Sequence, residues 1–153
     1  MTYPQIIDYN DAVQTPLHAF SDPVLRAGQV ATTPLGLPLA LSGGFALTYT
    51  IRSRSSKLAV RCFHREVPSV QQRYAAISRR LRSIKSGYFV DFEFQPEGIR
   101  VNGNLYPIVK MDWAEGDTLG VYLDRKANDL NSLSQLRQAF AKLAAYLEQN
   151  SIA

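Results

Sequence analysis

Hydrophobic and polar positions follow two different periods through the middle of the chain. An alternation of period two runs over residues 45–52, with apolar side chains at Phe45, Leu47, Tyr49 and Ile51. Such alternation predicts a half-buried strand. A Ser-Arg-Ser-Ser turn at 53–56 and a second alternation over 58–63 predict that a partner strand folds back as a hairpin.

A helical period follows this hairpin. Ser69 and Gln72 have the spacing of a capping box, and Gly87 is a helix-ending residue. Between them, apolar side chains recur every three or four residues at Val70, Tyr74, Ile77, Leu81 and Ile84. This spacing predicts a helix over 69–84 with one apolar face.

Three further strands are predicted around this helix. Residues 88–94 are rich in aromatic and β-branched side chains, and Pro96-Glu97-Gly98 then predicts a turn or bulge. Asn102-Gly103 is a strong hairpin signal between strands at 99–101 and 105–111. Residues 37–41 predict one more strand ahead of the first hairpin.

The two ends of the chain differ in pattern. Residues 1–36 hold four prolines, and a fifth follows at Pro38, so we expect an extended leader there with a short helical turn near Pro23. A Ser132/Gln135 capping box predicts a final helix over 132–149. Its apolar stripe, which must contact something, consists of Leu133, Leu136, Phe140, Leu143 and Leu147.

Composition narrows the class of protein. The chain has 153 residues, 46% of them hydrophobic, one cysteine (Cys62) and no apolar run of membrane-spanning length. We therefore expect a soluble cytoplasmic protein that does not engage a membrane. Cys62 and His64 share a strand face, but the chain offers too few partners for a zinc site.

Positive charge is concentrated in one segment. Ten of the 17 Lys and Arg residues lie between Arg52 and Lys85, where Glu66 is the single acid. Such a patch suits nucleic acid, anionic lipid, a phosphate-bearing ligand or an acidic partner, but most charge runs are solvated helix faces. We favour the solvated face and do not expect nucleic acid as the partner.

Two segments of the first hairpin resemble protein kinases. Residues 41–49 are similar to the glycine-rich loop, which implies that Gly43 and Gly44 cover the phosphates of ATP. Residues 58–61, Leu-Ala-Val-Arg, resemble the V-A-I-K strand. The resemblance implies that Ala59 lies against adenine and that Arg61, in place of lysine, binds phosphate.

Two later segments extend the resemblance. The helix over 69–84 matches the αC helix, with Ile77 where a glutamate is usual. Residues 108–119 resemble the fifth strand and hinge of bacterial serine/threonine kinases, which implies Met111 as gatekeeper and backbone groups of Asp112 and Ala114 at the adenine edge.

The resemblance implies an α+β fold in three parts: an extended leader at 1–36, a kinase-like N-lobe at 37–118 with about five antiparallel strands, and the start of a truncated C-lobe at 119–153. The implied function is ATP binding within a transferase, an ATP:protein phosphotransferase. The catalytic aspartate, the metal-binding asparagine and the D-F-G aspartate would follow Ala153, so we expect no catalytic or metal-binding residue here and Mg²⁺ only with that C-lobe. Such a chain alone would not transfer phosphate.

The alternative is a pseudokinase-type scaffold that binds a protein substrate or partner. In that case the stripe at 133–147 is exposed and favours a homodimer.

Overall fold

The computed structural model describes residues 3–66, 68–84 and 86–152. They form two units, residues 1–113 and 114–153. The first unit is α+β, and its sheet is antiparallel with six strands in the described residues. These are β1 (Gln29–Val30), β2 (Ala40–Ser42), β3 (Ala46–Arg52), β4 (Lys57–Phe63), β5 (Phe92–Val101) and β6 (Asn104–Asp112).

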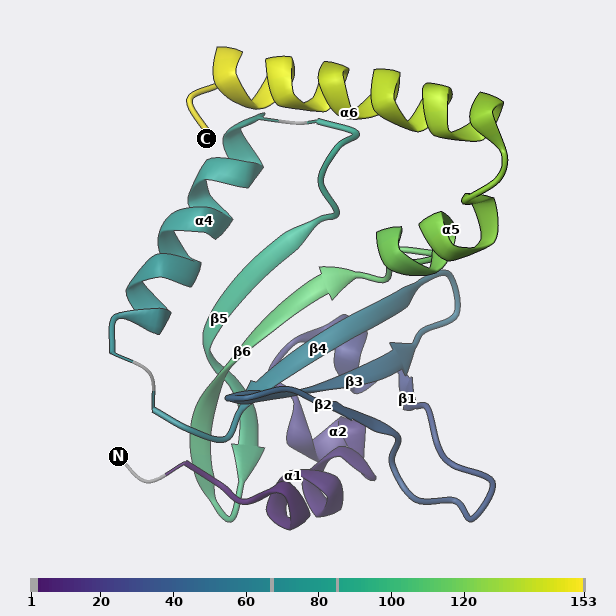
Figure 1. The fold of residues 1–153 in the computed structure, drawn as a ribbon. Helices are drawn as coiled ribbons and strands as arrows, with labels where there is room; N and C mark the ends of the chain where they lie inside the picture. The colour runs from purple at the N-terminus through teal and green to yellow at the C-terminus, as the bar shows by residue number, and fades with distance from the viewer. Residues whose placement is uncertain (1–2, 67, 85, 153) are drawn as a thin grey trace. The chain divides into compact units, whose positions relative to one another are not determined.

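The strand order is β1-β3-β4-β6-β5, and β2 pairs with β3 beside β1 (Figure 1). The predicted hairpin of 45–52 with 58–63 is confirmed, since Tyr49 pairs with Val60 and Ser53 N–H donates to Ser56 O at 2.9 Å. The Asn102-Gly103 hairpin is also confirmed. Both residues have positive φ, 48° and 82°, as a tight two-residue turn requires.

Strand β5 differs from its prediction at two points. It begins at Phe92, so residues 88–91 precede the strand. Pro96-Glu97-Gly98 lies within β5 as a bulge, because the pairing register shifts between Gln95 and Ile99. A Cβ on Gly98 would lie 2.2 Å from Cγ1 of Ile108, so only glycine allows this close approach.

Residues 1–36 are not extended, which corrects the expectation of a leader. They contain helices α1 (Ile6–Val13), α2 (Pro16–Ala19) and α3 (Pro23–Arg26). Proline begins α2 and α3, where its missing N–H costs nothing, so these prolines start helices rather than prevent them. The helical turn expected near Pro23 is α3, which Asp22 caps through the N–H groups of Val24 and Leu25.

These helices complete the core on one face of the sheet. Tyr9, Val13 and Leu25 are fully buried, as are Tyr49, Ile51, Val60 and Ile108 of the strands. The hydroxyl of Tyr9 donates to Phe63 O at 2.7 Å, and that of Tyr49 donates to Oδ1 of Asn10 at 2.7 Å. A second hydrophobic layer therefore comes from the segment that was predicted to be an extended leader.

Helix α4 (Val70–Ile84), expected over 69–84, lies against the other face. The ring of Tyr74 is 5.5 Å from that of Phe63 and 5.8 Å from that of Phe92. The buried hydroxyl of Ser78 donates to Phe92 O at 3.2 Å. Both faces of the central strands are thus covered, which explains why Ala46 and Ala59 are buried on the face that alternation assigned to small or polar residues.

The second unit contains α5 (Leu119–Lys126) and α6 (Leu130–Gln149). Asp129, not Ser132, caps α6, because its carboxylate accepts from the Ser132 N–H at 3.0 Å. The stripe predicted over 133–147 lies on α6, where no described residue is buried and Phe140 is 64% exposed. No helix in the described residues has the length and apolar character needed to cross a bilayer.

Candidate functional site

The sheet brings the two predicted adenine-contacting segments side by side. Ala59 of β4 pairs with Met111 of β6, and Leu58 pairs with Asp112. Since directly opposed residues of antiparallel strands point to one face, Ala59 and Met111 share a face. The pairing continues to Trp113, whose N–H donates to Lys57 O at 3.0 Å. Ala114 is the first residue of the second unit.

Arg61 lies two residues along β4 from Ala59, on the same face. One of its guanidinium nitrogens, Nη1, donates to the hydroxyl of Tyr74 on α4 at 3.2 Å, and its Cζ lies 5.3 Å from the centroid of the Phe45 ring. No acid forms an ion pair with Arg61 in the part of the chain that the structure describes. The described neighbours of the Arg61 guanidinium are therefore a tyrosine and a phenylalanine, and neither of them neutralises its charge as a carboxylate would.

One buried nitrogen of the Arg61 guanidinium, Nε, lacks a hydrogen-bond partner among the described residues. A buried donor without an acceptor costs about 1–3 kcal/mol, and more for a charged group. An anion that accepted from Nε would remove this cost, so the site is chemically suited to phosphate or carboxylate oxygens.

The turn that contains Gly43 and Gly44 joins β2 to β3. Its last residue, Phe45, contacts Arg61. Gly43 N–H donates to Ala46 O at 2.8 Å, and Gly43 O lies 3.2 Å from Nε2 of His64. Neither Gly43 nor Gly44 has a positive φ, and a Cβ on Gly44 would meet no atom within 4 Å. The turn thus leaves open space above Gly44 without needing glycine for its conformation.

A hollow of about 290 Å³ adjoins this arrangement. Phe45 of the turn forms one wall, and α4 supplies the rest through Val70, Arg73, Tyr74 and Ile77. Because Phe45 and Tyr74 also contact Arg61, the hollow and the cation share two residues. Ile77, at the position where the resemblance expected a glutamate, lies in the wall of this hollow.

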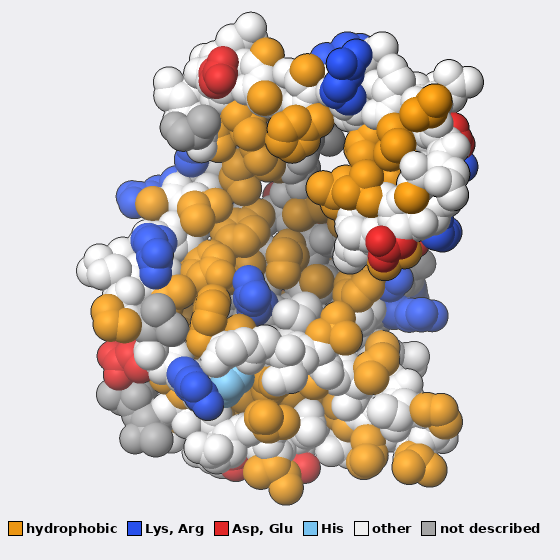
Figure 2. Space-filling view, viewed as in Figure 1, with side chains coloured by type: hydrophobic (Ala, Val, Ile, Leu, Met, Phe, Trp, Pro, Cys, Tyr) orange, Lys and Arg blue, Asp and Glu red, His pale blue; other side chains and the backbone are white. Residues whose placement is uncertain are grey.

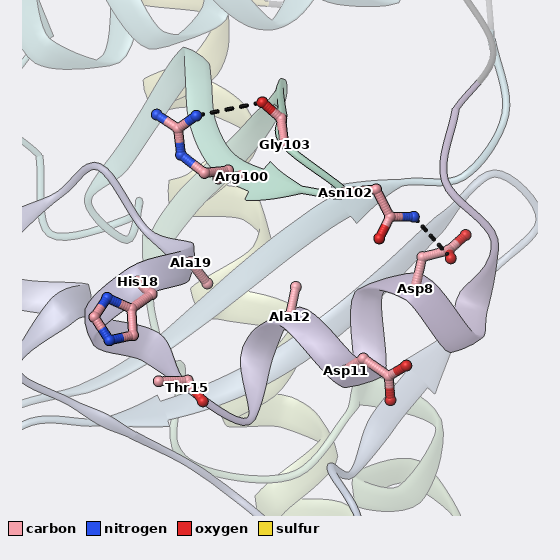
Figure 3. Close-up of a pocket in the computed structure, with 9 residues that line it drawn as sticks. All are labelled: Asp8, Asp11, Ala12, Thr15, His18, Ala19, Arg100, Asn102 and Gly103. Atoms are coloured by element: carbon pink, nitrogen blue, oxygen red, sulfur yellow. Dashed lines mark hydrogen bonds between the residues drawn. The ribbon is translucent and has the colours of Figure 1, made fainter.

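A second hollow, of about 350 Å³, lies between α1, α2 and the β5–β6 turn (Figure 3). Three of its polar groups are used within the fold. Asp8 accepts from the side chain of Asn102 at 3.0 Å, which holds the β5–β6 turn against α1, and Arg100 donates to Gly103 O within that hairpin at 3.3 Å. We therefore assign this hollow a structural role.

The remaining reactive side chains are also structural. Cys62 is fully buried, and burial raises the pKa of its thiol well above its usual range. A thiol in that state is a poor nucleophile at neutral pH. Residues 3–66, 68–84 and 86–152 contain no group of three His, Cys, Asp or Glu side chains that could hold a metal ion.

Sequence patterns identified some of these residues and missed others. Strand alternation placed Ala59 and Arg61 on one face, which the pairing geometry bears out. Phe45 and Tyr74 were expected only as core positions of a strand and a helix. Their contact with Arg61 depends on how α4 crosses the sheet, and the periodicity of the sequence does not specify that crossing.

Comparison with known proteins does not assign the chain to a family. No family model, curated protein or solved structure matches it.

Proposed function

We propose that the sheet and the segment after β6 bind the adenine and phosphates of ATP, as the N-terminal lobe of a protein-kinase-like protein. The observation that carries the proposal is the pairing of Ala59 with Met111, which sets the strand bearing Arg61 beside the segment proposed as the hinge. The order of elements adds support, since β2, β3, β4, α4, β5 and β6 follow one another directly before that segment.

The proposed roles follow from the site geometry. Met111, which is partly exposed beside the buried Ala59, would offer an apolar surface to adenine, and the backbone of Asp112 and Ala114 would offer hydrogen bonds to its edge. The guanidinium of Arg61, whose Nε has no partner among the described residues, would donate hydrogen bonds to phosphate oxygens under the turn at Gly43 and Gly44. Mg²⁺ would enter only with groups supplied by a C-lobe.

We expect ATP to bind this chain in the high micromolar range or weaker, because this lobe supplies only one wall of a cleft. Replacing Arg61 by Gln should weaken ATP binding about tenfold, since a hydrogen bond to a charged group contributes about 1.5–3 kcal/mol. Two-dimensional NMR titration of the full chain with ATP measures both affinities.

Arg52→Gln is the matched control, because Arg52 is exposed at the end of β3 and carries the same charge. Adenosine and inorganic triphosphate, titrated separately, divide the affinity between the base and the phosphates. An absence of saturable shifts at β4 and β6, or equal losses in the two variants, would contradict nucleotide binding on this face. A submicromolar affinity would contradict the single-wall arrangement.

A scaffold of the pseudokinase type is the second candidate. Two observations favour it: Arg61 bonds to Tyr74 rather than to an acid, and Phe140 is largely exposed on α6. Here a partner protein, or a second copy of the chain through the stripe at 133–147, would contact α6.

For the homodimer, we expect the wild-type chain to sediment as a dimer at about 100 µM, and Phe140→Glu to shift it to monomer because a charge cannot be buried at the interface without a partner. Sedimentation velocity measures this, and Lys142→Glu on the same helix controls for charge. A monomeric wild type, or dimers in both variants, would remove the homodimer from consideration.

A further inference from the structure

Helix α4 carries positive charge along its whole length. Residues 70–84 include four arginines and no acid. All four, Arg73, Arg79, Arg80 and Arg82, are exposed. Arg73 and Arg80 are seven residues apart, or about two helical turns, so they form a row on one side of α4 that spans about 10 Å. This row is too long for one phosphate or carboxylate and suits an extended polyanion.

The hollow of about 290 Å³ opens beside this row. Its lining is apolar except for Arg73, and Ile77 is 44% exposed within it. Figure 2 shows Lys and Arg side chains along the outer side of α4 and hydrophobic side chains next to them. A ligand that fits both features carries negative charges on each side of one apolar group.

Two classes of polyanion fit this surface poorly. Single-stranded nucleic acid needs aromatic faces on which bases stack, but the ring of Tyr74 already packs against Phe63 and Phe92, and that of Phe45 stacks on Phe63 at 6.4 Å. A lipid surface needs a long free apolar helix face, but Val70 and Tyr74 of α4 pack on the sheet, which leaves only the part of that face around Ile77 exposed.

We propose that α4 and the 43–45 turn bind an acidic peptide segment of a partner protein. An aromatic or branched aliphatic side chain of the peptide fills the hollow against Val70 and Ile77, and flanking carboxylates pair with Arg73 and its neighbours on α4. Charge complementarity sets the approach of the segment, and the hollow gives it a register. The 43–45 turn also belongs to the proposed ATP site, but Arg61 does not line the hollow, so the peptide proposal does not require ATP binding.

Fluorescence anisotropy of the full chain with a labelled Asp-Glu-Phe-Glu-Asp peptide tests the proposal. We expect saturable binding that weakens at least fivefold when the peptide Phe is replaced by Ala. Arg73→Gln should weaken binding about tenfold, and Ile77→Gln about fivefold. Arg54→Gln, which removes an equal charge from the exposed β3–β4 turn, should change it less than twofold.

All three protein substitutions are at exposed side chains, and near-UV circular dichroism verifies that each variant is folded. Equal binding of the Phe and Ala peptides would overturn the role of the hollow. Equal losses of peptide affinity for Arg73→Gln and Arg54→Gln would mean that the peptide responds only to the net charge of the protein. Tighter binding of oligo-dT or of phosphatidylserine vesicles, with the same dependence on Arg73 and Ile77, would replace the peptide by that class of partner.

Discussion

Replacing Tyr9 by Ala should destabilise the chain by about 4 kcal/mol, because it empties the space of a large, fully buried ring and removes a hydrogen bond. Tyr9→Phe should cost only about 1–2 kcal/mol, since the ring stays and Phe63 O alone loses its donor. Urea denaturation followed by circular dichroism measures both free energies of unfolding.

Ile7→Ala on the same helix is the matched control. Ile7 is 68% exposed, so its loss should change the free energy of unfolding by no more than about 0.5 kcal/mol. If Tyr9→Ala lowered the free energy of unfolding as little as Ile7→Ala does, α1 would not pack on the sheet. The segment would then be the extended leader that its prolines predicted.

Replacing Asp22 by Asn should cost about 2–3 kcal/mol at pH 7. Its carboxylate lies 2.5 Å from Nζ of Lys110 and is only 9% exposed. Asn can still cap α3 through Oδ1, so the change removes only the bonds of Oδ2, to Lys110 and to Gln95. Breaking one partner of a buried pair costs about 3–5 kcal/mol, and Glu93, 3.0 Å from the same Nζ, reduces that figure here.

The same ion pair makes stability depend on pH. Burial opposes ionisation of Asp22, but hydrogen bonds from Lys110, from the Leu25 N–H and from Gln95 outweigh it and lower the pKa of the carboxyl. Stabilisation from this group is therefore full above its unfolded pKa of about 3.9 and is lost as the pH falls through the lower folded value. Burial likewise opposes the charge of Lys110, but Asp22 and Glu93 raise its pKa, so its contribution is lost only as the pH rises through that raised value.

Urea denaturation at pH 7 and at pH 3 should show the effect. The wild type should lose more stability between these two pH values than Asp22→Asn does. Glu97→Gln removes an exposed carboxyl from the neighbouring bulge and should follow the wild type. Parallel acid profiles for all three proteins would mean that Asp22 is not ionised in a partly buried pair.

Local patterns predict elements well and their tertiary partners poorly. Alternation over 45–63, the Asn102-Gly103 turn and the period of α4 depend on neighbours a few residues apart, and all three are confirmed. The leader was wrong because proline excludes a helix interior but not its first turn, and Pro16 and Pro23 occupy first turns. The start of α6 was two residues late because Asp129 competes with Ser132 for the capping position.

The candidate site shows the same division. The side-by-side placement of Ala59 and Met111 follows from two hairpins and the pairing between them, which sequence periods make plausible. The bond between Arg61 and Tyr74 needs the angle at which α4 crosses β4, set by packing against Phe63 and Phe92. No spacing in the chain encodes that angle, so the tyrosine partner of Arg61 was not foreseen.

The contacts of the N-terminal helices have a consequence for biosynthesis. Asp8 bonds to Asn102, and Asp22 to Lys110, across 94 and 88 residues. During translation, the first three helices are made long before their partners in β5 and β6 leave the ribosome, and closing such long loops is slow. Tyr9 and Leu25 therefore stay without their final neighbours for most of the synthesis of the chain. Chaperone binding in this period would protect the nascent chain from aggregation.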